Sequence, residues 1–149
     1  MSRPSDGLAF RCAGCAGVNK VDAARLRDGP VCGRCQAPLD TSGAPLDLGD
    51  RELEALVRSS PVPVLVDLWA PWCGPCRLVA PEIDRVARAN AGRLIVVKVD
   101  TDQHQQTLVS LGARGIPTFA IYQGGELRAQ RSGALSRPQL EAWLRATTG

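Results

Sequence analysis

Six cysteines, arranged as three Cys-x-x-Cys pairs, constrain this chain more than any other feature of its sequence. Two pairs fall within the first 40 of the 149 residues and one stands alone in the remainder, and the pairs are Cys12/Cys15, Cys32/Cys35 and Cys73/Cys76. Between the two groups, Asp40 to Pro45 is rich in turn-forming residues, which indicates a boundary. We therefore expect a small domain over residues 1–40, a linker over 41–46 and a larger domain over 47–149.

The rest of the composition narrows the environment in which these cysteines work. The start of the chain, Met1 to Asp6, lacks the apolar stretch of a secretory signal, and no run of about 18 apolar residues predicts a membrane span. We therefore expect a cytoplasmic protein without a membrane partner, in which cysteines serve metal binding or redox chemistry rather than a disulfide framework. The net charge is only +3 and the arginines are scattered, so we expect no nucleic-acid partner.

The two N-terminal pairs have the spacing of a zinc ribbon. Four thiolates form a closed tetrahedral shell of the kind that holds structural zinc, and the predicted ligands are Cys12, Cys15, Cys32 and Cys35. Gly14, Gly17 and Gly33 permit the tight turns that such a site needs. Because this segment has few large apolar side chains, we expect the metal to supply its folding free energy. Additional redox disulfides and iron–sulfur ligation stay open as alternatives from the residues alone.

The longer segment alternates strand and helix patterns. Almost continuous apolar runs at Val62–Trp69 and Leu94–Val99 predict strands that are buried on both faces. Between them, apolar residues recur at helical spacing from Cys76 to Ala87, with Pro81 as a predicted kink. This spacing points Cys76 inward and leaves Cys73, at the start of the helix, nearer solvent.

Further elements complete an α/β pattern. Helices are predicted at Asp50–Ser59, at Gln105–Leu111 and after Ser136, and strands at Thr118–Tyr122 and Glu126–Ser132 on either side of a Gly124-Gly125 turn. The order β-α-β-α-β-α-β-β-α predicts a central mixed sheet flanked by helices, with parallel strands and a terminal antiparallel hairpin.

Cys73 and Cys76, in Trp72-Cys73-Gly74-Pro75-Cys76, can close a small disulfide. At a helix start, backbone N–H groups and the helix dipole favour the thiolate form of Cys73. A thiolate is the attacking species in disulfide exchange, and a second thiol one turn away can resolve the product. Half of a zinc site is the alternative interpretation of this pair.

Asp67 stands out because it interrupts an apolar strand. Burial without a partner raises the pKa of a carboxyl group, which suits a proton acceptor. The alternative is a hydrogen-bonded residue at a sheet edge with no role in chemistry. His104, the only histidine, lies in a polar segment, and we expect it on the surface, neither a base nor a metal ligand.

The run from Asp67 to Arg77 and the run Gly115-Ile116-Pro117-Thr118 resemble the thioredoxin family, over about residues 47–149. Together with Val31-Cys32-Gly33-Arg34-Cys35, the chain resembles the bacterial thioredoxin 2 type, which begins with a zinc ribbon. The resemblance implies a thioredoxin fold preceded by a four-cysteine zinc ribbon. It also implies reduction of protein disulfides, with an NADPH-dependent flavin thioredoxin reductase as electron donor. We expect a monomer.

The resemblance also implies roles for single residues. Cys73 is the attacking thiol, Cys76 the resolving thiol, and Asp67 the buried acid that assists deprotonation of Cys76. Pro117 is a cis-proline that packs against the disulfide, whereas an ordinary trans proline is the alternative from sequence alone. The other implied site residues are Trp72, Gly74, Pro75, Ile116 and Gly133 in the substrate groove, with Trp69 and Lys98 in support. Trp69 as plain core and Lys98 as a side chain reaching outward are their alternatives.

The dipeptide Gly74-Pro75 places no cation beside the thiolate, which favours a reductant over an oxidant. No G-x-G-x-x-G segment is present, so we expect no bound flavin or nicotinamide. The sequence therefore predicts a cytosolic protein-disulfide reductase. A zinc-gated redox sensor and a partner-binding module on a thioredoxin scaffold are the alternatives, and the intact Cys-Gly-Pro-Cys argues against the module.

Overall fold

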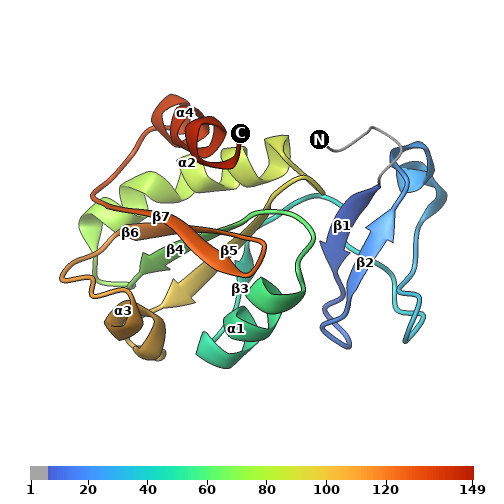
Figure 1. Ribbon diagram of the computed structural model, residues 1–149, viewed down its shortest axis with the longest axis horizontal. Helices are drawn as coiled ribbons and strands as arrows, with labels where there is room; N and C mark the ends of the chain where they lie inside the picture. The colour runs from blue at the N-terminus through green and yellow to red at the C-terminus, as the bar shows by residue number, and fades with distance from the viewer. Residues whose placement is uncertain (1–6) are drawn as a thin grey trace.

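The computed structural model describes residues 7–149, which form a small N-terminal ribbon (residues 7–40) and a larger C-terminal unit (residues 46–149) (Figure 1). The expectation about a secretory signal at Met1 to Asp6 lies outside the described residues. Within residues 7–149, no helix has both the length and the apolar character needed to cross a membrane.

The ribbon is built on a two-stranded antiparallel sheet, in which β1 (Leu8–Arg11) pairs with β2 (Val18–Val21). A short 3-10 helix, η2 (Ala23–Asp28), follows, and Asp22 caps it by accepting the backbone N–H of Ala24. The buried apolar side chains of the ribbon are few, namely Ala9, Phe10, Cys12, Val21 and Cys32. This sparse core agrees with the expectation that burial alone does not hold the segment together.

Five strands of the C-terminal unit form one mixed sheet in the order β3-β5-β4-β6-β7. The first three are parallel, whereas β6 runs antiparallel to β4 and pairs with β7 through the predicted turn at Gly124 and Gly125. The strands are β3 (Leu46–Asp47), β4 (Val64–Trp69), β5 (Ile95–Asp100), β6 (Thr118–Gln123) and β7 (Glu126–Ser132). The predicted mixed sheet with a terminal hairpin is confirmed.

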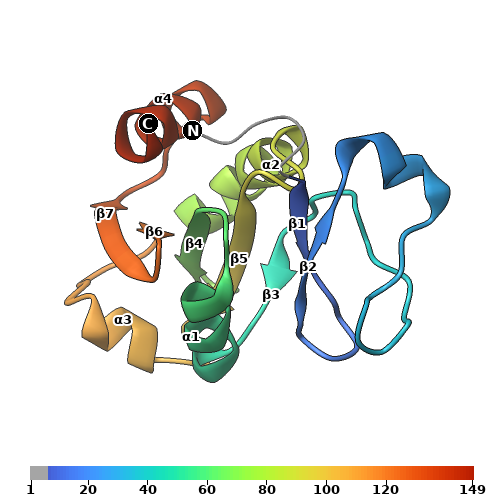
Figure 2. The same cartoon turned by 45° about the vertical axis from the view of Figure 1, so that its right-hand side comes forward.

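Helices cover both faces of this sheet (Figures 1 and 2). One face packs against α2 and α4, and the other packs against α1 and α3. The helices are α1 (Asp50–Ser59), α2 (Gly74–Ala89), α3 (Gln106–Ser110) and α4 (Arg137–Thr148). Helix α2 continues through Pro81, and α4 begins with the capping box predicted at Ser136 and Gln139.

Strand β4 is almost continuously apolar because both of its faces are buried under helices. Leu65 packs in the core beneath α2 and α4, while Val64, Val66 and Leu68 pack in the core beneath α1. Because side chains alternate along a strand, Asp67 shares the face of Leu65, toward α2. The start of α2 and the ribbon lie at opposite ends of the C-terminal unit (Figure 1).

Candidate active site and metal centre

Cys73 is the N-cap residue of α2, and Cys76 lies in the first turn of that helix. The two residues form a disulfide, with their Cα atoms 5.3 Å apart. The backbone N–H of Cys76 points at Cys73 Sγ across 3.2 Å. A donor in this position stabilises negative charge on the sulfur when the pair is reduced, so the helix start favours the thiolate of Cys73.

The expectation that Cys73 lies nearer solvent than Cys76 is wrong for the disulfide form. Both residues are only 3 % exposed. Ala70, Trp69 and Ile116 pack against the pair, and Cys73 Sγ lies 3.8 Å from the carbonyl oxygen of Ile116. Helical spacing predicts which side of α2 each residue occupies, but it carries no information about a distant loop that folds over the helix start.

The loop that covers the disulfide contains the predicted cis peptide bond, between Ile116 and Pro117. The carbonyl oxygen of Pro117 accepts the backbone N–H of Gly133 at 2.9 Å. Gly133 has a φ of 98°, a left-handed conformation that favours glycine. The structure therefore places Ile116 against the cysteine pair, with Pro117 next to it in the chain and Gly133 bonded to Pro117, although all three are distant from the pair in sequence.

Asp67 lies in the central strand β4 and is 1 % exposed. Neither of its carboxylate oxygens has a hydrogen-bond partner among residues 7–149. Burial raises the pKa of Asp67 to about 7, and the positive charge of Lys98 opposes this rise. The alternative of a hydrogen-bonded residue at a sheet edge is therefore excluded, and the side chain is a carboxyl group that can exchange a proton near neutral pH.

Lys98 is the register partner of Asp67 in the neighbouring strand β5. Its Nζ atom lies 4.8 Å from the centroid of the Trp69 ring, which is the arrangement of a cation–π contact. Trp69 in turn packs against the cysteine pair, so it is not plain core. Lys98 therefore lies beside Asp67 in the sheet and over the ring of Trp69, and Trp69 itself packs against the disulfide.

The opposite side of the cysteine pair is exposed. Trp72 is 69 % exposed, and its indole N–H donates to Asp102 Oδ1 at 2.9 Å. Gly74 and Pro75 are also exposed at the helix start, and Leu78 follows them with 78 % exposure. Trp72, Pro75 and Leu78 thus form an exposed apolar rim at the helix start, beside the buried disulfide.

Sequence reasoning missed Asp102, Ala70 and Leu78 as parts of this site. Asp102 follows strand β5 in a turn, and nothing in its local sequence indicates Trp72 as its partner. His104, which we expected on the surface, is partly exposed, and one side of its ring packs against Gly49. A Cβ atom at Gly49 would lie 2.7 Å from the His104 ring, so glycine is needed there for this contact.

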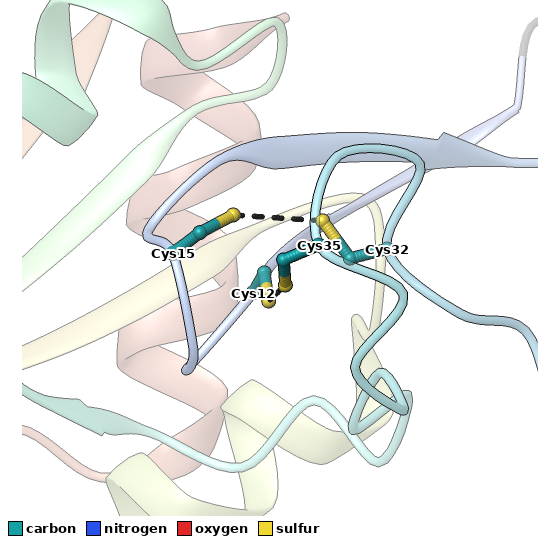
Figure 3. A group of neighbouring side chains, drawn as sticks. All are labelled: Cys12, Cys15, Cys32 and Cys35. Carbon is teal, nitrogen blue, oxygen red and sulfur yellow. Dashed lines mark hydrogen bonds between the residues drawn. The ribbon is translucent and has the colours of Figure 1, made fainter.

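The four ribbon cysteines converge in a second site (Figure 3). Their Sγ atoms all lie within 4.8 Å of one another, with 3.5 Å between Cys12 and Cys35 and 3.6 Å between Cys15 and Cys32. Tetrahedral zinc with Zn–S bonds of about 2.3 Å places its sulfur ligands about 3.8 Å apart. The donor set and its spacing therefore fit a zinc ion.

Each cysteine pair of the ribbon sits in the same kind of turn. The residue after the second cysteine is left-handed in both, with φ 67° at Ala16 and at Gln36. In both turns the first cysteine donates its backbone N–H to a carbonyl oxygen five residues later, Gly17 for Cys12 and Ala37 for Cys32. The glycines that we expected to permit these turns therefore do not occupy the left-handed positions, because Ala16 and Gln36 do.

Backbone N–H groups also point at the ribbon sulfurs. Those of Gly14 and Arg34 lie 3.3 Å from Cys12 Sγ and 3.4 Å from Cys32 Sγ, respectively. The backbone N–H groups of Cys35 and Arg34 lower the pKa of Cys32 to about 6. A lower thiol pKa favours metal binding, because zinc binds the thiolate form.

The family model for thioredoxin matches residues 45–146. The chain belongs to the thioredoxin family. A second family model, for the N-terminal zinc ribbon of thioredoxin 2, matches residues 11–37. The expected fold and family are therefore confirmed, and with them a thiol-disulfide oxidoreductase.

Similar proteins cover either the C-terminal unit alone or most of the chain. Thioredoxin of Pseudomonas aeruginosa is 45 % identical over 101 residues, which are 68 % of this chain and 94 % of that protein. Thioredoxin C-3 of Corynebacterium nephridii is 36 % identical over 134 residues, which are 89 % of this chain and 90 % of that protein. The second similarity extends into the ribbon.

Proposed function

We propose that this thioredoxin reduces disulfide bonds of other proteins through the Cys73–Cys76 dithiol of its Cys-Gly-Pro-Cys segment. The observation that carries the proposal is the disulfide at the start of α2, covered by the cis-proline loop. Gly74 and Pro75 place no cation beside the thiolate, which supports a reductant rather than an oxidant. A reductant works in a reducing compartment, so we place the protein in the cytoplasm.

In the first step, the Cys73 thiolate attacks one sulfur of a substrate disulfide. A bond forms between Cys73 Sγ and that sulfur, and the other substrate sulfur leaves as a thiolate that takes up a proton. Because the cysteine pair is buried beside an exposed apolar rim, the substrate approaches along Trp72, Pro75 and Ile116, and Gly133 borders the same groove.

In the second step, Cys76 loses its proton and its thiolate attacks Cys73 Sγ. The mixed disulfide breaks, the second substrate sulfur leaves as a thiolate, and the Cys73–Cys76 disulfide forms. The two electrons have then passed to the substrate. Asp67 accepts the Cys76 proton in this proposal, because its pKa of about 7 allows proton uptake near neutral pH. Lys98 keeps that pKa from rising further.

Restoring the dithiol requires two electrons from another protein. The family resemblance suggests an NADPH-dependent flavin thioredoxin reductase as the donor, and we propose that the chain acts on its substrates as a monomer.

We further propose that the ribbon binds one zinc ion through Cys12, Cys15, Cys32 and Cys35. Four thiolates close the coordination shell, which leaves no open position for a substrate and assigns the ion a structural role. The spacing of the four sulfur atoms and the N–H groups that point at two of them support this assignment.

Insulin reduction with dithiothreitol as electron source tests the proposed activity. The wild-type protein should accelerate insulin precipitation well above dithiothreitol alone. Cys76→Ser should attack insulin but stall as a mixed disulfide on Cys73, which mass spectrometry detects as a covalent adduct. A wild-type protein that gave no acceleration would favour the partner-binding module, and normal turnover by Cys76→Ser would contradict the division of roles.

A zinc-gated redox sensor is the second candidate function, because Cys15 and Cys35 of the cluster are exposed and open to oxidants. It predicts that mild oxidant releases zinc at doses that leave the fold intact. A zinc indicator dye and circular dichroism, followed in the same titration, measure both events. Retention of zinc up to the dose that unfolds the protein would exclude the sensor.

A further inference from the structure

Strand β1 of the ribbon packs against the C-terminal unit (Figure 2). Its residues Ala9 and Phe10 are only 2 % and 5 % exposed. The backbone N–H of Ala9 donates to the carbonyl oxygen of Gly92 at 2.9 Å, which joins the ribbon to the segment before β5. Val18 of β2 packs against the core beneath α1. The ribbon therefore shares apolar contacts and a backbone hydrogen bond with its neighbour.

Gly92 allows the close approach of strand β1, and Gly43 allows the close approach of the linker to the same segment. Gly92 has φ 80°, and a Cβ atom there would lie 2.4 Å from Leu8 Cβ and 2.9 Å from Phe10 Cζ. Gly43 also has φ 80°, and a Cβ atom there would lie 2.6 Å from Ala91 Cβ. Any side chain at Gly92 would push strand β1 away from the C-terminal unit.

An ion pair adds a charged contact beside the first cysteine of the cluster. Arg11 immediately precedes Cys12, its side chain is 9 % exposed, and its Nη2 atom lies 3.2 Å from Glu52 Oε2. The other carboxylate oxygen of Glu52 accepts the backbone N–H of Gly49 at 3.2 Å. The residue next to Cys12 is thus tied to the start of helix α1.

The contact between the ribbon and the C-terminal unit lies at the β3 edge of the sheet. Strand β3, at that edge, has only two residues, Leu46 and Asp47. A cavity of about 150 Å³ between ribbon and sheet is walled from both sides, by Phe10 and Arg11 on one and by Leu46, Leu94 and Val96 on the other. Removing the ribbon would expose these apolar strand residues to water.

We propose that docking of β1 makes the ribbon a metal-dependent brace for the β3–β5 side of the C-terminal unit. The ribbon has too small a core to fold without its metal, and only the folded ribbon presents β1 to Gly92. Zinc binding therefore stabilises the C-terminal unit through the docked face, because a ligand that binds only the native form shifts the folding equilibrium. This inference rests on the proposed zinc site and is independent of the proposed reaction.

Thermal unfolding of the full chain tests the brace, with and without removal of zinc by a chelator. All three tryptophans, Trp69, Trp72 and Trp143, lie in the C-terminal unit, so their fluorescence reports the unfolding of that unit alone. Zinc content is measured first, and Cys73–Cys76 is kept oxidised throughout. The variants are Gly92→Ala and its matched control Gly125→Ala. Both positions have the same left-handed φ, 80° and 81°, but a Cβ atom at Gly125 meets nothing within 4 Å.

We expect zinc removal to lower the fluorescence Tm of the wild-type protein and of Gly125→Ala by several degrees. Gly92→Ala should still bind one zinc per chain, because all four cysteines are intact. Its Tm should respond to zinc removal by less than half as much, since the docked face is already displaced. Phe10→Ala, which changes no residue of the C-terminal unit, should respond as Gly92→Ala does and replaces it if that variant does not fold.

Three results would overturn the inference. A wild-type Tm that does not change on zinc removal would show that the two units unfold independently. Equal responses of Gly92→Ala and Gly125→Ala, or of Phe10→Ala and wild type, would show that the β1 face does not carry the coupling. A wild-type chain that binds no zinc would overturn both the zinc site and the brace, whereas one bound zinc without a Tm response overturns the brace alone.

Discussion

The ribbon and the C-terminal unit use the same Cys-x-x-Cys spacing for different sites. In the ribbon, each pair is followed by a left-handed residue, Ala16 or Gln36, and the turn directs both sulfur atoms toward the other pair. In the C-terminal unit, the pair is followed by helix α2, and its two sulfur atoms meet only each other. The backbone that follows the pair, rather than its spacing, therefore distinguishes a metal knuckle from a redox disulfide.

Stabilisation of a thiolate does not separate the two sites. Backbone N–H groups point at Cys12 and Cys32 in the ribbon and at Cys73 at the start of α2. The two sites differ in the groups that surround their sulfur atoms. Ribbon residues 7–40 gather four thiols and include no buried acid, whereas the redox pair lies at the start of α2, the helix that covers the sheet face of Asp67, a buried carboxyl group with a pKa of about 7. Metal binding needs the former, and proton transfer needs the latter.

The largest expected effect comes from exchanging a cysteine of one site. Cys73→Ser should lower insulin reduction to the rate of dithiothreitol alone and still bind one zinc, because no other thiol occupies the helix start. Cys12→Ser and Cys35→Ser should lose the zinc, since three thiolates do not close the shell. Metal analysis and the turbidity assay on the same preparations check both. Zinc loss in Cys73→Ser would break the separation of the two sites.

The next effect concerns Asp67, the proposed proton acceptor, whose buried carboxyl group has no counterpart among ribbon residues 7–40. The folded pKa of Asp67, about 7, exceeds its ordinary value of 3.8, so the folded state holds the proton more tightly than the unfolded state. Stability from this group is therefore full below about pH 4 and is lost as pH rises through 7, by up to about 4 kcal/mol. Asp67→Asn should remove this loss and be the more stable protein at pH 8.

The same variant should slow the second step of the reaction about tenfold near pH 7, because an amide cannot accept the Cys76 proton. Urea unfolding at pH 5 and pH 8 measures stability, and release of reduced insulin measures the step. Unchanged kinetics between pH 6 and pH 8 would argue that Asp67 plays no part in proton transfer.

A smaller effect tests how far the units depend on each other. Deleting residues 1–40 should leave a folded protein that reduces insulin, because every residue assigned to exchange lies in the C-terminal unit. The loss of the docked Phe10 side chain should destabilise that unit by about 2 kcal/mol, which lowers its Tm by about 8–16 °C. Calorimetry and the turbidity assay measure the two properties. A folded but inactive truncation would mean that the ribbon contributes to the active site.

The smallest effect sharpens the comparison of the turns. Ala16→Gly should stabilise the ribbon by about 1 kcal/mol or less, because glycine adopts the left-handed conformation without the steric cost of a Cβ atom, although it loses more entropy on folding. Gly14→Ala is a control in the same turn that leaves φ ordinary. Competition for zinc with a chelator of known affinity measures the change, and weaker zinc binding by Ala16→Gly would contradict this account of the turn.

The sequence predicts the parts of the fold that local patterns determine. Apolar runs located β4 and β5, helical spacing located the buried side of α2, and cysteine spacing located the metal cluster. The cover of Cys73 by Ile116, the bond from Trp72 to Asp102 and the docking of β1 on Gly92 are different. Each joins segments that are remote in sequence, and none leaves a periodic pattern in either segment. The unusual position of Asp67 could be predicted from the sequence, because a lone charged residue in an apolar strand is itself a local signal.

The shortness of strand β3 has a further consequence, for association between chains. An edge strand offers unpaired N–H and C=O groups to any extended segment, and a two-residue edge offers very few. The opposite edge, β7, is long but carries Glu126, Arg128 and Arg131, and such charges oppose pairing with another strand. A protein that reduces the disulfides of other proteins is thus protected at both edges of its sheet against pairing with an extended segment of another chain.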